Sequence, residues 1–196
     1  APPATPVFVA PQAVLDATAG LHLHRGVLAL AERAAPRDPA RLLAPDPLLC
    51  LALIGLSNAD NVGASFRNAA AFDADAVLLD ETCCDPLYRK AIRVSSGHAL
   101  SLPFAQSGDG AAMLDALHAA GVETWALTPA GGEPLQSLEP PRRLALMLGA
   151  EGPGLPSALM DRARRVSIPM AGGVDSLNVA TAGAVALAHV FVARRR

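Results

Sequence analysis

Apolar residues in this chain fall into short uninterrupted runs, separated by segments rich in polar residues, glycine or proline. Four runs are predicted to be buried strands, namely 49–55, 76–79, 123–127 and 144–148. A shorter run at 166–168 is predicted to be a further strand, and 102–104 a short extended segment. Between them, 62–72, 86–94, 111–120, 156–161 and 179–193 are predicted to be helices. This alternation predicts an α/β fold, a mostly parallel sheet with helices on both faces.

The first 48 residues have a different pattern. We predict a strand at 6–10, a helix at 11–18, a polar turn at 21–26 and a strand at 27–31. These elements are too few to form a core of their own. We therefore divide the chain into an N-terminal extension (1–33), a linker rich in Pro, Arg and Asp (34–48) and a main domain (49–196). His22 and His24 alternate in strand register, which fits either a solvated face or a site for metal or RNA.

Composition narrows the class of protein. The chain is 52% apolar but only 4% aromatic, so the core is expected to be built from Ala, Leu and Val. A net charge of −2 excludes a generally basic protein, so a nucleic acid would have to be held by local arginine clusters. The most apolar run, 179–193, is too short to span a membrane. Only one of the 16 basic residues is lysine, a bias that fits either phosphate binding or a GC-rich genome.

The three cysteines do not have the spacing of a metal site, so no metal is expected. Their odd number, with no recognisable signal peptide, leads us to expect free thiols and a cytoplasmic protein.

Three loops combine glycine with polar residues directly after predicted strands: 58–67, 148–155 and 168–178. Ligands of parallel sheets bind beyond the carboxyl ends of the strands. Neither a Walker loop nor a Rossmann fingerprint is present in them. In the third loop, Ser176 is predicted to cap the last helix. The residues alone indicate an α/β enzyme that binds a polar ligand, although the third loop also fits a plain connection.

The same loops carry a family resemblance. Asn61 to Arg67 match Asn-x-Gly-x-x-x-Arg, and Gly149 to Leu155 match Gly-x-Glu-Gly-x-Gly-Leu. Ile168 to Ala180 match Ile-Pro-Met-x-Gly-x-x-x-Ser-Leu-Asn-Val-Ala. With three motifs in this order, the chain resembles the SpoU (TrmH-like) RNA ribose 2′-O-methyltransferases of the SPOUT superfamily. More weakly, 14–29 resemble the end of the substrate-binding domain that precedes many members, so 1–33 is predicted to be its remnant.

The resemblance implies a C-terminal deep trefoil knot, an obligate homodimer and S-adenosylmethionine as cofactor. It implies methyl transfer to a ribose 2′-hydroxyl of tRNA or rRNA, without a metal and without a membrane. By motif match, the cofactor site should be lined by Leu127, Thr128, Gly149, Gly152, Ile168, Met170 and Leu177.

The resemblance also suggests roles for polar residues. In the family, the arginine of the first motif, here Arg67, is assigned the removal of the proton from the 2′-hydroxyl. A guanidinium with a pKa of about 13 is, however, a poor base. We therefore expect Arg67 to bind phosphate and steady the alkoxide. The expected catalytic residues are Arg67, Asn61, Glu151, Ser176 and Asn178, and the expected RNA contacts are Arg67, Arg89, Lys90, Arg93 and Ser176.

Each role has an alternative. Asn61 is expected to orient Arg67 or the ribose, but it also fits a loop Asn that tolerates the left-handed region. Glu151 is expected to hydrogen-bond loop amides or the third-motif Asn, but it also fits a solvated loop acid. Ser176 and Asn178 are expected to hold the target phosphate and the loops, and a role of Ser176 as helix cap is compatible with that. The whole chain also fits an inactive member of the same fold that binds cofactor or RNA.

Overall fold

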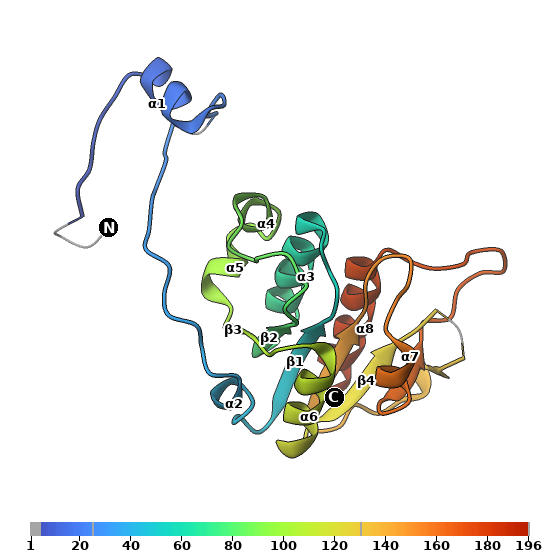
Figure 1. Ribbon diagram of the computed structural model, residues 1–196. Coiled ribbons are helices and arrows are strands. Elements are labelled where there is room, and N and C mark those ends of the chain that lie inside the picture. The colour runs from blue at the N-terminus through green and yellow to red at the C-terminus, as the bar shows by residue number, and fades with distance from the viewer. Residues whose placement is uncertain (1–4, 25, 130, 196) are drawn as a thin grey trace. The chain divides into compact units, whose positions relative to one another are not determined.

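The computed structural model describes residues 5–24, 26–129 and 131–195 (Figure 1). Its contacts divide the chain into two units, residues 1–35 and 36–196, which are described separately below. Residues 1–4 and 25 of the predicted extension lie outside the described residues, as do residue 130 of the loop before the fourth long strand and residue 196. No helix in the described part of the chain is both long and apolar enough to cross a membrane.

In its described residues the smaller unit contains one helix, α1 (Gln12–Ala19), close to the helix predicted at 11–18. The strands predicted at 6–10 and 27–31 are wrong, because both segments lack regular structure. Val9 and Leu30 are 98% and 102% exposed, and α1 has no buried residue. A strand needs hydrogen-bonded neighbours and an apolar surface to pack on, and the described residues of this unit offer neither.

A carboxylate organises the turn after α1. Asp16 accepts a hydrogen bond from the Leu23 amide at 2.9 Å and contacts His22 Nδ1 at 2.7 Å. These hydrogen bonds lower the pKa of Asp16 to about 2. The rings of His22 and His24 meet edge to face, with centroids 4.9 Å apart. The histidines therefore lie in the predicted turn segment, and no strand underlies their alternation.

The larger unit is built on a seven-stranded sheet in the order β3-β2-β1-β6-β4-β7-β5. Every pair of neighbouring strands is parallel, which confirms the predicted α/β class. The strands are β1 (Leu48–Leu53), β2 (Ala76–Leu79), β3 (Phe104–Gln106), β4 (Glu123–Leu127), β5 (Glu133–Pro134), β6 (Arg143–Leu148) and β7 (Arg164–Ser167). The helices are α2 (Pro39–Leu42), α3 (Ala59–Ala71), α4 (Arg89–Val94), α5 (His98–Ser101), α6 (Gly110–Ala119), α7 (Ser157–Met160) and α8 (Val179–Ala193), with a 3₁₀ turn, η1 (Leu135–Ser137).

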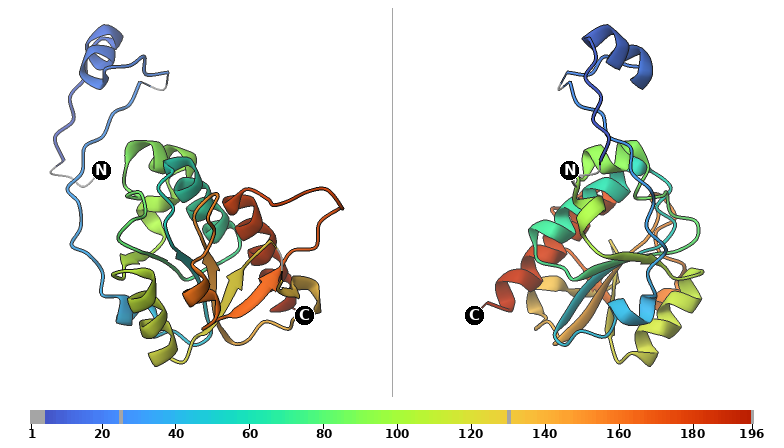
Figure 2. Two further views of the ribbon diagram at one scale, coloured as in Figure 1. Left: turned by 45° about the vertical axis from the view of Figure 1, so that its right-hand side comes forward. Right: turned by 90° about the vertical axis from the view of Figure 1, so that its left-hand side faces the viewer.

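Helices cover both faces of this sheet, as predicted (Figures 1 and 2). Alternate residues of β1 belong to opposite layers: Leu49, Leu51 and Leu53 pack with α3 and α8, whereas Leu48, Cys50 and Ala52 pack with α6 and α7. Because a strand's side chains alternate between its faces, a strand buried on both faces is apolar throughout. The continuous apolar runs of β1, β2 and β6 follow from this position in the middle of the sheet.

Several element boundaries in the structure differ from those predicted from the sequence. The predicted linker contains α2, and Leu43 after it is buried in the core. The predicted loop at 128–140 contains η1 and β5, the latter because Glu133 and Pro134 pair with β7 and form the edge of the sheet. Asn61 was assigned to a loop, but α3 begins at Ala59, since Asn58 accepts a hydrogen bond from the Asp60 amide and caps the helix.

Candidate functional site

The carboxyl ends of four neighbouring strands meet at one edge of the sheet. Leu53 of β1 is paired with Leu148 of β6, and Leu127 of β4 with Val166 of β7. The loops that follow β1, β6 and β7 carry the three motifs. Parallel strands thus bring together segments that are separated by more than a hundred residues of sequence.

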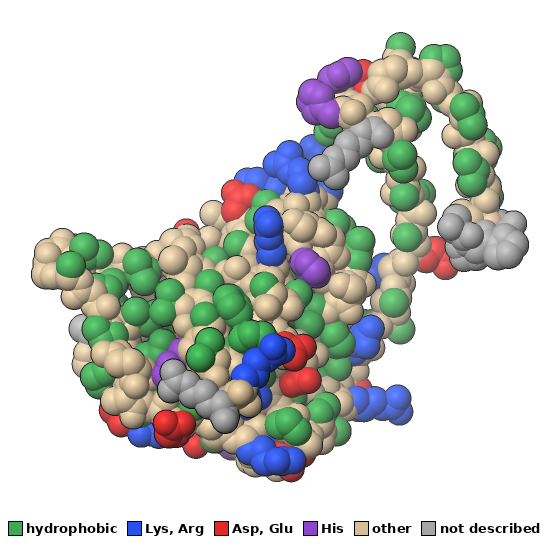
Figure 3. Space-filling view, turned by 180° about the vertical axis from the view of Figure 1, so that it is seen from behind, with side chains coloured by type: hydrophobic (Ala, Val, Ile, Leu, Met, Phe, Trp, Pro, Cys, Tyr) green, Lys and Arg blue, Asp and Glu red, His purple; other side chains and the backbone are tan. Residues whose placement is uncertain are grey.

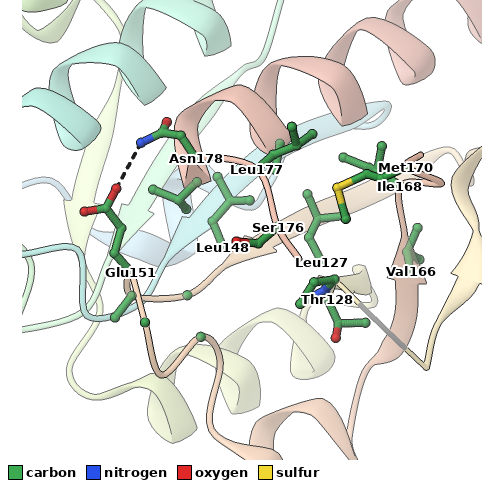
Figure 4. A pocket seen from close by; sticks show the side chains of 17 residues that line it. Leu127, Thr128, Leu148, Glu151, Val166, Ile168, Met170, Ser176, Leu177 and Asn178 are labelled. Carbon is green, nitrogen blue, oxygen red and sulfur yellow. Dashed lines mark hydrogen bonds between the residues drawn. The ribbon is translucent and has the colours of Figure 1, made fainter. Parts of the chain in front are cut away.

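A cavity of about 340 Å³ lies at this edge, between the ends of β4, β6 and β7 and the start of α8 (Figure 4). All seven residues predicted to line the cofactor site line it: Leu127, Thr128, Gly149, Gly152, Ile168, Met170 and Leu177. Sequence reasoning missed further lining residues, among them Pro129, Leu148, Ala150, Gly154, Val166, Val179 and Ala182. Most of these residues are next to a predicted one in the sequence. They could have been found by including the residues at the strand ends that adjoin each motif.

The cavity wall is mainly apolar side chains and glycine backbone. Among the described residues that line it, Glu151 is the only one with an ionisable side chain. Ser176 and Asn178 add a hydroxyl and an amide. Such a site suits a ligand of mixed character, with an apolar body and a few polar groups.

The loop after β6 is folded tightly on itself. A Cβ added at Gly149 would lie 2.3 Å from the Gly154 carbonyl carbon, and the Gly154 amide donates to the Ala150 oxygen at 3.0 Å. Gly152 and Gly154 have φ values of +85° and +70°, a region that favours glycine. The glycines of the second motif therefore have a local steric cause, and they leave backbone exposed at the cavity.

Asn178 joins the three motifs through hydrogen bonds. Its Nδ2 donates to Asn61 Oδ1 at 3.0 Å and to Glu151 Oε1 at 2.9 Å, the latter drawn in Figure 4. Its Oδ1 accepts from the amides of Ala180 and Thr181, so Asn178 is the N-cap of α8. Ser176, predicted as that cap, is an exposed residue of the loop that lines the cavity instead.

Arg67 is not part of this hydrogen-bonded group. It lies six residues after Asn61 on α3, which places the two side chains on different faces of the helix. Asn61 is 6% exposed, whereas Arg67 is exposed and has no hydrogen-bond or ion-pair partner among the described residues. The structure therefore brings together Asn61, Glu151 and Asn178, and leaves Arg67 outside their contacts.

The predicted RNA-contacting residues Arg89, Lys90 and Arg93 lie on α4, which packs against α3. The two helices approach closely at Gly63, where an added Cβ would lie 2.6 Å from the Ala91 oxygen. All three basic residues are exposed, and Lys90 Nζ contacts Asp60 Oδ2 of α3 at 2.7 Å. In Figure 3 the basic side chains lie in several separate groups, with acidic and apolar side chains between them.

The comparison with family models settles the class to which this arrangement belongs. Residues 48–188 match the model of the SpoU rRNA Methylase family. The chain belongs to the SpoU family. The match begins at β1 and ends within α8, so the sheet and all three motifs fall inside it.

Relatives support the SpoU assignment. The chain is 42% identical, over 187 residues, to an uncharacterised tRNA/rRNA methyltransferase of Mycobacterium tuberculosis, with 92% of this chain and 64% of the relative covered. It also resembles two solved structures at 28% identity. One is an AdoMet-bound rRNA methyltransferase from Sinorhizobium meliloti (TM-score 0.72, covering 84% of this chain and 61% of that one). The other is an RNA 2′-O ribose methyltransferase (TM-score 0.71, covering 90% and 63%).

The chain spans less than two thirds of the length of each of these three proteins.

Proposed function

We propose that this SpoU protein transfers a methyl group from S-adenosylmethionine to a ribose 2′-hydroxyl of tRNA or rRNA. The observation that carries the proposal is the contact of Asn178 with both Asn61 and Glu151, beside the cavity. Three motifs that are distant in sequence are thereby tied into one polar group next to a ligand-sized space. The two similar solved proteins, one bound to AdoMet and one described as a 2′-O ribose methyltransferase, support the same assignment.

The cavity fits this cofactor in size and chemistry. Its volume of about 340 Å³ lies within the range of small-molecule sites. The side chains of Leu127, Ile168, Met170 and Leu177 offer an apolar wall for an adenine ring, and the Gly149–Gly154 backbone offers polar groups. The Glu151 carboxylate is an acceptor that favours a positively charged ligand. When bound, the cofactor supplies an activated methyl group on a cationic sulfur.

The residues of the chain have separate tasks in this proposal. Asn178 holds Asn61 and Glu151 in place, so that the loops after β1, β6 and β7 keep one geometry. Arg67, exposed and with no described partner, is available to bind a phosphate and to stabilise charge that develops on the ribose oxygen. Ser176 at the cavity mouth and Arg89, Lys90 and Arg93 on α4 extend the contact to the RNA.

Two further features of the proposal, one within the chain and one between chains, come from the family resemblance. One is a deep trefoil knot in the C-terminal segment. The other is a homodimer, for which α8 offers the exposed apolar residues Val185 and Val192. Sedimentation velocity over a range of protein concentrations should give one species of twice the chain mass, and a monomer throughout would contradict the dimer.

The test of function uses S-adenosylmethionine labelled on its methyl group, together with total RNA. Ribose methylation blocks alkaline cleavage of the next phosphodiester, so label should appear in alkali-resistant dinucleotides. Label found only on bases or on protein would overturn the ribose assignment. Cofactor binding without any transfer would instead indicate an inactive member of the fold.

Arg67→Lys keeps the positive charge and loses the planar fork that binds phosphate. We expect this variant to lose turnover and RNA affinity while binding the cofactor normally. If it keeps both turnover and RNA affinity, Arg67 has no part in the mechanism.

A further inference from the structure

The turn between β1 and α3 is held by polar contacts around one buried carboxylate, none of whose residues is among those that line the cavity. Asp80, at the end of β2, is only 5% exposed. Both oxygens of its carboxylate accept from the Gly55 amide, at 3.2 and 3.1 Å. The Thr82 hydroxyl donates to the same two oxygens at 2.9 and 3.0 Å, and the Thr82 amide to one of them at 3.1 Å. A buried carboxylate with this many donors is held firmly in one orientation.

Two cysteines continue these contacts to the next residue of the turn. Cys83 Sγ accepts from the Leu56 amide and donates to the Leu53 oxygen, both at 3.3 Å. The Cys84 amide donates to the Leu56 oxygen at 2.8 Å. Burial raises the pKa of the Cys83 thiol to about 12, so it keeps the proton that it donates. The loop 80–84 therefore binds the turn at Leu53, Gly55 and Leu56.

This turn lies between two of the motifs. Gly55 has a φ of +73°, and an added Cβ would lie 3.2 Å from the Cβ of Ala150, which lines the cavity. Three residues after Gly55, Asn58 caps α3, the helix that carries Asn61 and Arg67. A displacement at Gly55 would therefore reach the start of α3, the helix that leads away from this contact with the cavity wall.

We propose that Asp80 is a positioning residue for methyl transfer, which sets the entry of α3 relative to the cavity by binding the Gly55 amide. The inference rests on the proposed function, because it assigns Asp80 to the reaction of that site. Among the described residues, the hydrogen bonds of the Asp80 carboxylate go to Gly55 and Thr82, which neither line the cavity nor belong to the polar group around Asn178. It acts through the β1–α3 turn. Transfer between aligned atoms is sensitive to small errors of position, so looseness here reduces turnover more than cofactor binding.

The experiment compares Asp80→Asn with Asp75→Asn, the same substitution at an exposed carboxylate. Asp75 Oδ2 accepts from the Leu49 amide at 2.7 Å, so both variants remove the charge from a carboxylate that binds a β1-adjacent amide. Leu49 lies near the amino end of β1, away from the motifs. We expect Asp80→Asn to lower turnover by about tenfold or more with cofactor affinity within about twofold of wild type, and Asp75→Asn to change neither by as much.

Hydrogen exchange gives a readout that does not depend on activity. Amides of residues 55–62 should exchange faster in Asp80→Asn than in Asp75→Asn. If Asp80→Asn does not fold, Thr82→Val takes its place, because it removes the hydroxyl that orients Asp80 while leaving the carboxylate. Equal exchange at 55–62 in the two Asp variants, or equal turnover, overturns the positioning role. Absence of transfer by the wild-type protein contradicts the proposed function alone, since the exchange comparison still stands.

Discussion

At the scale of single residues, Asn178 has two kinds of contact that few side chains could combine. Its amide oxygen caps α8, and its amide nitrogen binds Asn61 and Glu151. Aspartate and serine are good caps as well, but ionised aspartate has no donor and serine has only one. The position therefore needs an amide for the site, although the helix alone would accept several residues.

Substitution separates the two contacts of Asn178. Asn178→Ala should lower the free energy of unfolding by about 1 kcal/mol, because the cap is lost. Asn178→Asp keeps the accepting oxygen of the cap but puts a second carboxylate beside Glu151, so the temperature of unfolding should fall between those of wild type and Asn178→Ala. Both variants lose the donor and should lose turnover by about a hundredfold. Chemical denaturation and the labelled-RNA assay measure the two effects, and normal turnover by Asn178→Asp would show that the donor contacts are dispensable.

At the scale of elements, the predictions succeeded where one apolar run makes one element. The strands predicted at 76–79 and 123–127 and the helix predicted at 179–193 have the observed bounds. They failed where an element depends on a distant partner. The strand β5 forms only because Glu133 and Pro134 lie beside β7, and the apolar residues of 6–10 and 27–31 have no such neighbour among the described residues.

The loop after β6 gives a prediction about an element. Gly149→Ala places a methyl group 2.3 Å from backbone atoms, so the loop must shift and cofactor binding should be lost. Gly121→Ala is the control, since Gly121 also sits in a turn but has open space and a φ of +68°. The control should lower the free energy of unfolding by about 1 kcal/mol or more, through backbone strain alone. Calorimetric titration with S-adenosylmethionine tests both, and unchanged binding by Gly149→Ala would contradict the tight loop.

At the scale of the whole molecule, the two helical layers bury groups on both sides of the sheet. Cys50 lies in one layer and Cys83 in the other, whereas Cys84 is only partly buried. Burial raises the pKa of both Cys50 and Cys83 to about 12, and that of Cys84 above its usual value. The thiolate is the reactive form, so all three should react slowly in the folded protein.

Alkylation tests this burial directly. With N-ethylmaleimide near neutral pH, native protein should be labelled at Cys84 first, and at Cys50 and Cys83 only on unfolding. Denatured protein, in which all three should react, is the control. Peptide mass spectrometry locates the label, and labelling of Cys50 as fast as Cys84 in the native protein would contradict the layered core.

The sequence by itself determined the class of fold and the identity of the three motif loops. A strand buried on both faces must be apolar throughout, and a loop with close backbone contacts must contain glycine. Both features can therefore be recognised from the residue types within one short segment of sequence. The motif residues that line the cavity were predictable for the same reason, together with the family resemblance.

The contact of Glu151 with the Asn of the third motif was expected and is confirmed, but the tertiary structure decided the other contacts. Strand order places β6 between β1 and β4, and this order brings Asn61, Glu151 and Asn178 within hydrogen-bond distance across 117 residues of sequence. The same packing assigns the cap of α8 to Asn178 instead of Ser176, and directs Asp80 to the Gly55 amide. Such contacts depend on the positions of whole helices and strands relative to one another, and a local pattern of residues does not specify those positions.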